Sequence, residues 1–249
     1  MRFLAAILLV LFAQAGWAAD VKVRDGDTIQ LGGTTYRLAS VDAPEFDQMC
    51  INEYADPWAC GVEAREQLIK LIGKRAVRCQ DLGPDKTYGK WRSAICSVEG
   101  ETTSLNRSMI RKGFALNLDV SGQSRFKDDE ATAKEGRDGL WKGCFVSPPD
   151  FRRWDEHAVL LGAACRADKD REIRNALFPE RTSAPPGCSI KGKFALRAHV
   201  TGNVGVYQLQ GCRAYPSTTR PDRWFCSEDD AQAAGFRRAY NCRLGSRRN

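Results

Sequence analysis

Histidine is scarce in this sequence, and closely spaced cysteine pairs are absent. The 249 residues include only two histidines, and no two of the ten cysteines form a Cys-x-x-Cys motif. His157 and His199 are both isolated, so no Ser-His-Asp or Cys-His arrangement for covalent catalysis can be assembled. Without Cys-x-x-Cys pairs, neither a thiol redox motif nor a zinc knuckle is indicated.

Long apolar runs are also absent, except at the N-terminus. Residues 3–12 are almost entirely apolar, follow Arg2, and precede small residues ending at Gly16-Trp17-Ala18. This pattern predicts a secretion signal over residues 1–18, and the run is too short for a comfortable membrane span. An uncleaved anchor is the alternative. We therefore expect an exported chain, periplasmic or secreted, with no transmembrane span in its mature part.

The ten cysteines agree with export. Their number is even, and oxidising compartments preserve disulfides. Sequence alone does not fix the pairing, but the spacing suggests three local pairs. These are Cys50 with Cys60, Cys79 with Cys96, and Cys144 with Cys165.

The positive charge of the chain is concentrated near its end. The net charge is +7 in total, and residues 185–249 hold 11 Lys or Arg and 4 Asp or Glu, which is also +7. This excess favours an anionic partner there, such as nucleic acid, an acidic polysaccharide or a membrane surface. A solvated basic face is an equally good interpretation.

Polar residues gather at the ends of a predicted hairpin near the N-terminus. The first strand carries Thr28, Ile29 and Leu31, Gly32-Gly33 forms the turn, and the second strand covers 34–41. A hairpin brings its outer ends together. The side chains expected to meet there are Asp25, Asp27, Asp42 and Glu45, beside Arg37.

Several carboxylates at one place repel each other unless a cation joins them. Hard oxygen donors suit calcium or magnesium, and an arginine suits a phosphate. Asp-Gly pairs are also ordinary turn chemistry, and for Asp25 alone that interpretation is the better one. For Asp27, Arg37, Asp42 and Glu45 together, a functional site is favoured.

Helices and further strands follow the hairpin. Apolar periodicity and stop or cap residues predict helices and strands on either side of a turn. The predicted elements are helices 62–72, 104–112 and 125–136, strands 75–80 and 92–98, a turn over 85–90, and a charged connector helix over 153–177. Trp141, Phe145 and Trp154 are expected to pack against the barrel that these elements form.

These motifs resemble the staphylococcal nuclease-type (thermonuclease) family over about residues 20–154. The matching residues, in order, are Asp25-Gly26-Asp27-Thr28, Tyr36-Arg37-Leu38, Asp42-Ala43-Pro44-Glu45, Tyr88-Gly89-Lys90 and Gly139-Leu140-Trp141. The resemblance, with these short strands and helices, implies an α+β fold that is mainly β. It would be a five-stranded oligonucleotide-binding-type barrel with packed helices.

The resemblance also implies roles for individual residues. Asp27 and Asp42 would hold calcium with the main-chain carbonyl of Ala43, and Asp25 would lie just behind them. Glu45 would orient or deprotonate the attacking water, while Arg37 would bind the phosphate bidentately. Tyr88 would contact the substrate.

This sequence departs from the family pattern at two places. Lys90 replaces the family's second catalytic arginine, and lysine lacks the planar fork that grips two phosphate oxygens. Arg92 is a candidate substitute in the same extended segment. The second departure is in the substrate groove, where Asp119 and Ser121 replace a pair of tyrosines.

The C-terminal region resembles two small modules. Residues 188–192 and 224–228 are similar to a module appended to some bacterial secreted nuclease-like proteins, and residues 206–212 and 233–242 to the zinc module of the Ada DNA-repair protein. Only two of the four Ada cysteines are kept, Cys212 and Cys242, which makes a poor zinc site. A disulfide between them is expected instead, leaving Cys188 with Cys226.

The predicted organisation has four parts. They are a signal peptide over 1–18, the nuclease-like domain over 19–154, a connector helix and linker over 155–184, and a small basic cysteine-containing module over 185–249. With 43% hydrophobic residues, the chain is long enough for a core and a smaller module.

Two functions remain open from the sequence. The first is a secreted calcium-dependent nuclease that cleaves DNA and RNA with little sequence preference, by resemblance leaving 3′-phosphates. The second is a non-catalytic barrel that binds an anionic polymer, either nucleic acid or an acidic exopolysaccharide. Lys90 favours the second function. The carboxylate set favours the first, because binding a polyanion has no need of carboxylates.

Overall fold

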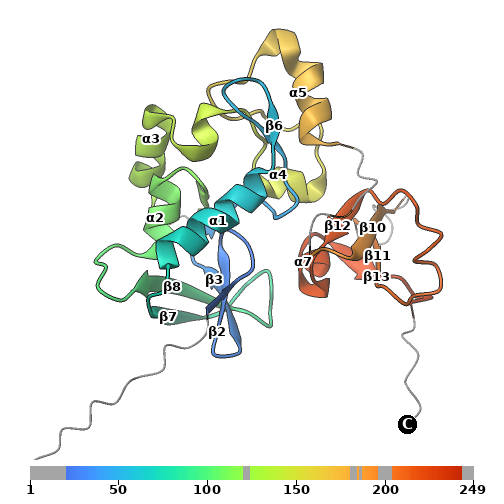
Figure 1. Ribbon diagram of the computed structural model, residues 1–249, viewed down its shortest axis with the longest axis horizontal. Coiled ribbons are helices and arrows are strands. Elements are labelled where there is room, and N and C mark those ends of the chain that lie inside the picture. Colours follow the sequence, from blue (N-terminus) through green and yellow to red (C-terminus); the bar gives the residue numbers. More distant parts are fainter. Residues whose placement is uncertain (1–20, 120–123, 180–183, 185–186, 196–203, 243–249) are drawn as a thin grey trace, which may run out of the picture.

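The computed structural model describes residues 21–119, 124–179, 184, 187–195 and 204–242 (Figure 1). The predicted secretion signal over residues 1–18 lies outside these ranges, as do Ser121 and His199. The described chain forms a larger α+β body and a smaller C-terminal module beside it.

A five-stranded sheet forms the centre of the larger body. Its strand order is β1-β2-β3-β8-β7, with β1 at Val21–Val23, β2 at Thr28–Leu31, β3 at Thr34–Leu38, β7 at Val77–Pro84 and β8 at Arg92–Val98. The pairs are antiparallel except β3 with β8, which is parallel. Gly32 and Gly33 join β2 to β3 with φ of 56° and 86°, the positive values that a tight two-residue hairpin needs. This is the predicted hairpin.

The second strand of the hairpin is shorter than predicted. It ends at Leu38, because Ser40 has φ of 60° and breaks the extended backbone. The chain resumes as β4 (Val41–Asp42), which pairs with β9 (Leu116–Asn117) instead of continuing in the main sheet. The buried Asn106 side chain fixes this break by donating a hydrogen bond to the carbonyl of Ala39 at 3.0 Å. The break turns Asp42 away from the line of β3.

Two helices pack against the sheet and complete the barrel core. Helix α1 (Cys60–Ile72) buries Ala64, Leu68 and Ile72 and ends at Gly73, as predicted. Helix α2 (Leu105–Arg111) begins after Ser104, whose hydroxyl accepts a hydrogen bond from the amide of Arg107. The core that they share includes Ile29, Leu38, Val41, Ala94, Met109 and Ile110. The result is the predicted oligonucleotide-binding-type barrel with packed helices.

A second layer of short elements covers the barrel at one end (Figure 1). The strands β5 (Cys50–Ile51) and β6 (Pro57–Trp58) pair with each other, and α3 (Lys127–Gly136) leads into a 3₁₀ turn over Gly139–Lys142. Trp141 and Phe145 are buried here with an edge-to-face contact between their rings. The sequence predicted packing against the barrel, but these rings lie in a cluster with Cys50, Cys60, Ala133 and Leu140 that is separate from the barrel core, and Trp154 packs on Phe151 and Phe178 instead.

The predicted connector is not one helix. Helix α4 (Pro148–Arg153) is capped by Ser147 and ends at Trp154, which has a left-handed backbone. An irregular segment and a 3₁₀ turn (Ala167–Lys169) then lead to α5 (Asp170–Leu177). Ile173 and Leu177 of α5 pack with Phe151 of α4 in one buried cluster. This segment is therefore part of the larger body and is not an isolated connector helix.

The C-terminal module has its own sheet and core. Its strand order is β12-β10-β11-β13, formed by Arg223–Phe225, Ile190–Phe194, Gly205–Gln208 and Phe236–Arg238, and α7 (Glu228–Ala233) covers it. Tyr207, Phe225 and Phe236 are buried in this core. Trp154 of the larger body packs against Phe194 of the module.

Five disulfides join the cysteines in the predicted pairs. They are Cys50–Cys60, Cys79–Cys96, Cys144–Cys165, Cys188–Cys226 and Cys212–Cys242. Such a set is typical of an oxidising compartment outside the cytosol. Within the described ranges, no helix is long and apolar enough to cross a membrane.

Candidate active site

The ends of the hairpin bring two aspartates to one arginine. Arg37, buried on β3, donates from Nη2 to Asp42 Oδ1 at 2.7 Å and to Asp27 Oδ2 at 3.4 Å. Burial acts to lower the pKa of Arg37, but the charges of Asp27 and Asp42 outweigh it and raise the pKa. Arg37 therefore stays a cation and holds the two carboxylates together.

Asp27 is fixed by several donors. Its Oδ1 accepts a hydrogen bond from the Thr28 hydroxyl at 2.7 Å, and its Oδ2 accepts one from the amide of Ala43 at 3.2 Å. Burial acts to raise the pKa of Asp27, but Arg37 and these donors reverse the effect and lower it. Asp27 is thus a carboxylate that joins the start of the hairpin to the residues after β4.

Arg152 is the member of the site that the sequence did not reveal. It lies on α4 and donates from Nη1 and Nη2 to both carboxylate oxygens of Asp42, at 3.0 and 2.8 Å, and from Nη1 to Glu45 Oε1 at 2.8 Å. Burial acts to lower the pKa of Arg152, whereas Asp42 and Glu45 raise it more strongly. No motif signalled this residue, because α4 follows the last family motif and Arg152 stands beside the equally basic Arg153.

Glu45 lies in the loop after β4, where two hydrogen bonds to Gln48 hold its main chain. Its amide donates to Gln48 Oε1 at 3.2 Å, and its carbonyl accepts from the Gln48 amide at 2.7 Å. Burial raises the pKa of Glu45, and the positive charges of Arg152 and Arg223 oppose this rise. Helix α1 approaches so closely that a Cβ on Gly61 would collide with the Glu45 carbonyl.

Asp25 lies next to Asp27 at the start of the hairpin. Its Oδ1 accepts a hydrogen bond from the Asp27 amide at 3.0 Å. Burial first, and then the charges of Asp27 and Asp230, raise the pKa of Asp25 well above its usual range. We refer to the four carboxylates and two guanidiniums collectively as the acidic cluster. Its members are Asp25, Asp27, Asp42, Glu45, Arg37 and Arg152.

The turn between β7 and β8 and the start of β8 carry three predicted residues, and one of them, Tyr88, lies beside the acidic cluster. The ring of Tyr88 stacks on Trp91 and lies 5.3 Å from the Arg37 guanidinium carbon. Lys90 is exposed, and among the described residues no hydrogen bond or ion pair joins it to the cluster. Arg92 pairs with Asp81 at 2.7 Å, which directs it along β7 and away from the site.

A second guanidinium reaches the carboxylates from outside the predicted residues. Arg152, and neither Lys90 nor Arg92, brings the second guanidinium to Asp42 and Glu45. Asp119, which stands where the family pattern has one of its two tyrosines, is exposed.

The donors match calcium in kind, because the cluster offers hard carboxylate oxygens and four acidic groups against two basic ones. Ala43 is buried beside them, with its amide on Asp27. In this arrangement, however, both oxygens of Asp42 accept hydrogen bonds from arginines. Within the described part of the chain, no set of three or more His, Cys, Asp or Glu is arranged around a common point for a metal.

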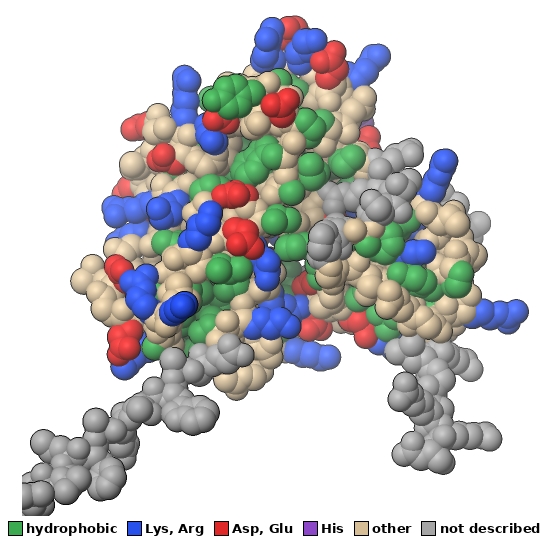
Figure 2. All heavy atoms as spheres, in the orientation of Figure 1, with side chains coloured by type: hydrophobic (Ala, Val, Ile, Leu, Met, Phe, Trp, Pro, Cys, Tyr) green, Lys and Arg blue, Asp and Glu red, His purple; other side chains and the backbone are tan. Residues whose placement is uncertain are grey.

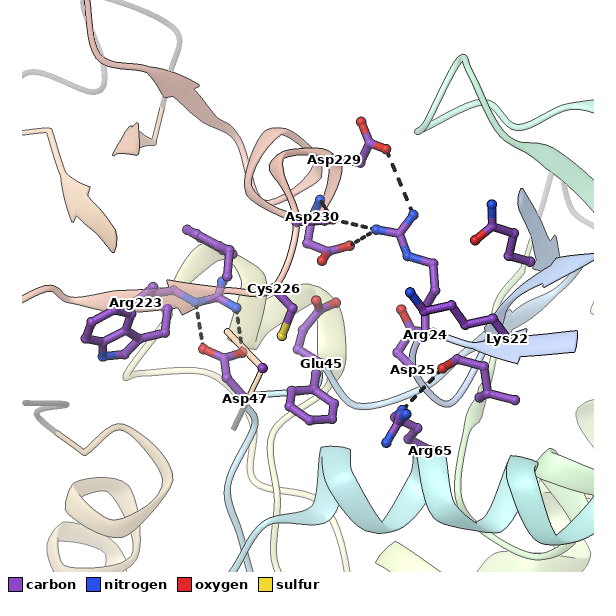
Figure 3. Close-up of a pocket in the computed structure, with 17 residues that line it drawn as sticks. Lys22, Arg24, Asp25, Glu45, Asp47, Arg65, Arg223, Cys226, Asp229 and Asp230 are labelled. Atoms are coloured by element: carbon purple, nitrogen blue, oxygen red, sulfur yellow. Dashed lines mark hydrogen bonds and ion pairs between the residues drawn. The ribbon is translucent and has the colours of Figure 1, made fainter. Parts of the chain in front are cut away.

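A cavity of about 500 Å³ lies next to the cluster, between the larger body and the C-terminal module (Figure 3). Asp25 and Glu45 line it from one side, and Trp224, Asp229 and Asp230 from the other. Arg24 crosses this boundary and donates to Asp230 at 3.2 Å. The module thus forms one wall of the space in front of Glu45.

Several basic side chains of the module form ion pairs with carboxylates. Lys193 pairs with Asp222, Arg238 with Glu228, and Arg223 with Asp47 of the larger body. On the face seen in Figure 2, Lys and Arg side chains are spread over the molecule with acidic side chains among them.

Fold and site together define a nuclease-type barrel with an arginine–carboxylate cluster at the mouth of its first hairpin. The family model "Staphylococcal nuclease homologue" matches residues 35–143. The chain is also 32% identical over 148 residues to the succinoglycan biosynthesis protein ExoI of Rhizobium meliloti (strain 1021), an overlap that covers 57% of this chain and 76% of that protein. The chain belongs to the staphylococcal nuclease homologue family.

Proposed function

We propose that the protein is an exported nuclease that hydrolyses phosphodiester bonds of DNA and RNA with little sequence preference and uses calcium. The observation that carries the proposal is the meeting of Arg37 and Arg152 at Asp42, beside Glu45. Two guanidiniums next to a carboxylate of raised pKa are the donors and the proton acceptor that this hydrolysis requires.

Glu45 would act on the water. It accepts a proton from the water as the water oxygen bonds to phosphorus. By resemblance, the bond that breaks is the one between phosphorus and the 5′-oxygen. The 5′-oxygen takes a proton from solvent water as it leaves, so one product carries a 3′-phosphate and the other a 5′-hydroxyl. Arg37 and Arg152 would donate to the non-bridging oxygens, on which negative charge accumulates.

Asp27 and Asp42, with the carbonyl of Ala43, would hold the calcium ion. When bound, the ion supplies positive charge that offsets the carboxylates and the phosphate. The Asp25 carboxylate supports Asp27 by accepting a hydrogen bond from the Asp27 amide. Tyr88 offers a ring face beside Arg37 for the substrate. Lys90 would serve only as a more distant positive charge.

The alternative is a binding protein for an anionic polymer, either nucleic acid or an acidic exopolysaccharide. Two observations favour it: Lys90 stands where the family has an arginine, and the similar protein ExoI is named for succinoglycan biosynthesis. The presence of a second guanidinium from Arg152 removes much of the argument from Lys90. We therefore favour the nuclease.

The proposal is tested by digesting single-stranded DNA and RNA with the oxidised mature protein. The digestion is done once with calcium and once with a chelator. Hydrolysis in calcium that stops with the chelator supports the nuclease. Retention of an acidic polysaccharide or of nucleic acid without any cleavage would favour the binding protein.

A further inference from the structure

The C-terminal module inserts one arginine into the larger body. Arg223, on β12, is 1% exposed and is the largest of the fully buried side chains in the described chain. It donates to Asp47, from Nη2 to Oδ1 at 3.0 Å and from Nε to Oδ2 at 3.5 Å, and Figure 3 shows the two side chains facing each other. Both partners are buried, so neither charge is compensated by water.

The partners of Arg223 are the two segments that carry the catalytic groups. Asp47 stands two residues after Glu45, inside the loop that Gln48 closes. Arg223 Nη1 also lies 3.5 Å from the main-chain carbonyl of Arg152, and its guanidinium carbon lies 4.8 Å from the ring centre of Phe151, the residue before Arg152. One side chain therefore contacts the Glu45 loop and the end of α4 together.

We propose that Arg223 is a positioning residue through which the C-terminal module holds Glu45 and Arg152 in their catalytic arrangement. This inference rests on the proposed function. The module is accordingly a structural part of the active site and more than an appended accessory domain. Arg223 touches no reacting atom in this scheme and acts through Asp47 and the backbone of Arg152.

The physical reason is that a buried guanidinium is tolerated only when its donors are satisfied by fixed partners. Each partner of Arg223 is thereby held at a defined place. Glu45 and Arg152 meet at 2.8 Å across this same region. A shift of about 1 Å between catalytic groups costs on the order of 100-fold in rate.

The competing explanation is that Arg223 only attaches the module to the larger body. Arg24 provides the control for this explanation. Arg24 also crosses the boundary, binding Asp230 of the module at 3.2 Å, but it contacts neither the Glu45 loop nor α4. Arg223→Met and Arg24→Gln each remove one cross-boundary cation. Only the first removes a contact with Asp47 and the Arg152 carbonyl.

The experiment compares kcat and KM for single-stranded DNA, together with thermal unfolding, in the full oxidised chain. We expect Arg223→Met to lower kcat about 10- to 100-fold with little change in KM. Arg223→Lys keeps the charge but cannot reach both partners. Its kcat should therefore lie between those of the wild type and Arg223→Met. Asp47→Asn combined with Arg223→Met should lose no more than Arg223→Met alone. A near-wild-type kcat in folded Arg223→Met, or an equal loss in Arg24→Gln, would overturn the inference.

A second measurement separates this inference from the proposed function. If the wild-type protein hydrolyses nothing, the nuclease proposal fails, and amide hydrogen exchange then decides about Arg223. The amides of Gln48 and Trp154, which bond to Glu45 and Phe151 carbonyls, should exchange faster in Arg223→Met and Arg223→Lys than in Arg24→Gln. Equal exchange rates in all three variants would mean that Arg223 does not hold these segments.

Discussion

Arg152 binds both carboxylate oxygens of Asp42, at 2.8 and 3.0 Å, although 110 positions separate the two residues in the chain. The pairing brings a guanidinium from outside the family motifs to the carboxylates of the first hairpin. In the nuclease scheme this contact changes which substitutions matter.

Arg152→Ala should abolish most hydrolysis. Losing one donor to the charge that develops in the transition state costs about 100-fold or more in rate, and kcat on single-stranded DNA measures the loss. The matched control is Arg153→Ala on the same helix, since Arg153 is exposed and pairs with Asp150 outside the acidic cluster. Equal rates in the two variants would remove Arg152 from the mechanism.

Lys90→Arg should change the rate little. From the sequence alone, an arginine at this position would be expected to restore a missing phosphate donor and raise kcat. The structure supplies that donor from Arg152 and leaves Lys90 exposed, so the site has less to gain. Arg92→Ala should likewise stay near the wild-type rate, because Arg92 pairs with Asp81. A large gain in kcat for Lys90→Arg would show that Arg152 does not fill the position.

Glu45→Ala and Arg37→Ala should each remove most hydrolysis, but with different effects on stability. Glu45 is partly exposed in its loop, so its removal should leave the fold intact. Arg37 is buried between Asp27 and Asp42, and removing it leaves buried charge less compensated. Breaking such a pair costs about 3–5 kcal/mol in free energy of unfolding, measured by denaturant titration. Near-native turnover in either variant would make that residue's proposed role wrong.

Hydrolysis should require calcium. Asp27 and Asp42 offer carboxylate oxygens of the kind that calcium accepts in flexible geometry, whereas magnesium prefers a tighter octahedral shell and keeps its waters. Activity should therefore disappear with a chelator, return with calcium and return less with magnesium. Undiminished hydrolysis by the demetallated protein would contradict this prediction.

Gly61→Ala should destabilise the protein and impair the site. A Cβ at this position would collide with the carbonyl of Glu45, a fixed backbone atom. Overpacking of this kind costs about 1–3 kcal/mol or more, and the displaced Glu45 loop should also lower kcat. Gly89→Ala is the control for stability, since nothing lies within 4 Å of a Cβ there. Unchanged stability in Gly61→Ala would mean that α1 does not constrain the loop.

Local signals along the chain predicted most of the secondary structure around the site. Glycine pairs, capping residues and apolar periodicity placed the hairpin, α1, α2 and β8 close to where they lie, since these signals act over a few residues. Short spacing gave three of the five disulfides, and the Cys212–Cys242 and Cys188–Cys226 pairs came from a resemblance. The break at Ser40 was missed, because it depends on Asn106 far along the chain.

Packing between segments that are distant in the chain completes the site. Asp27, Asp42, Glu45 and Arg37 are close in sequence, so the hairpin alone predicted their meeting. Arg152 and Arg223 reach the site only after α4 and the C-terminal module have packed against the barrel. Among many arginines in charged segments, nothing local distinguishes these two. Their burial against particular carboxylates is a property of packing, which no pattern along the chain encodes in a readable form.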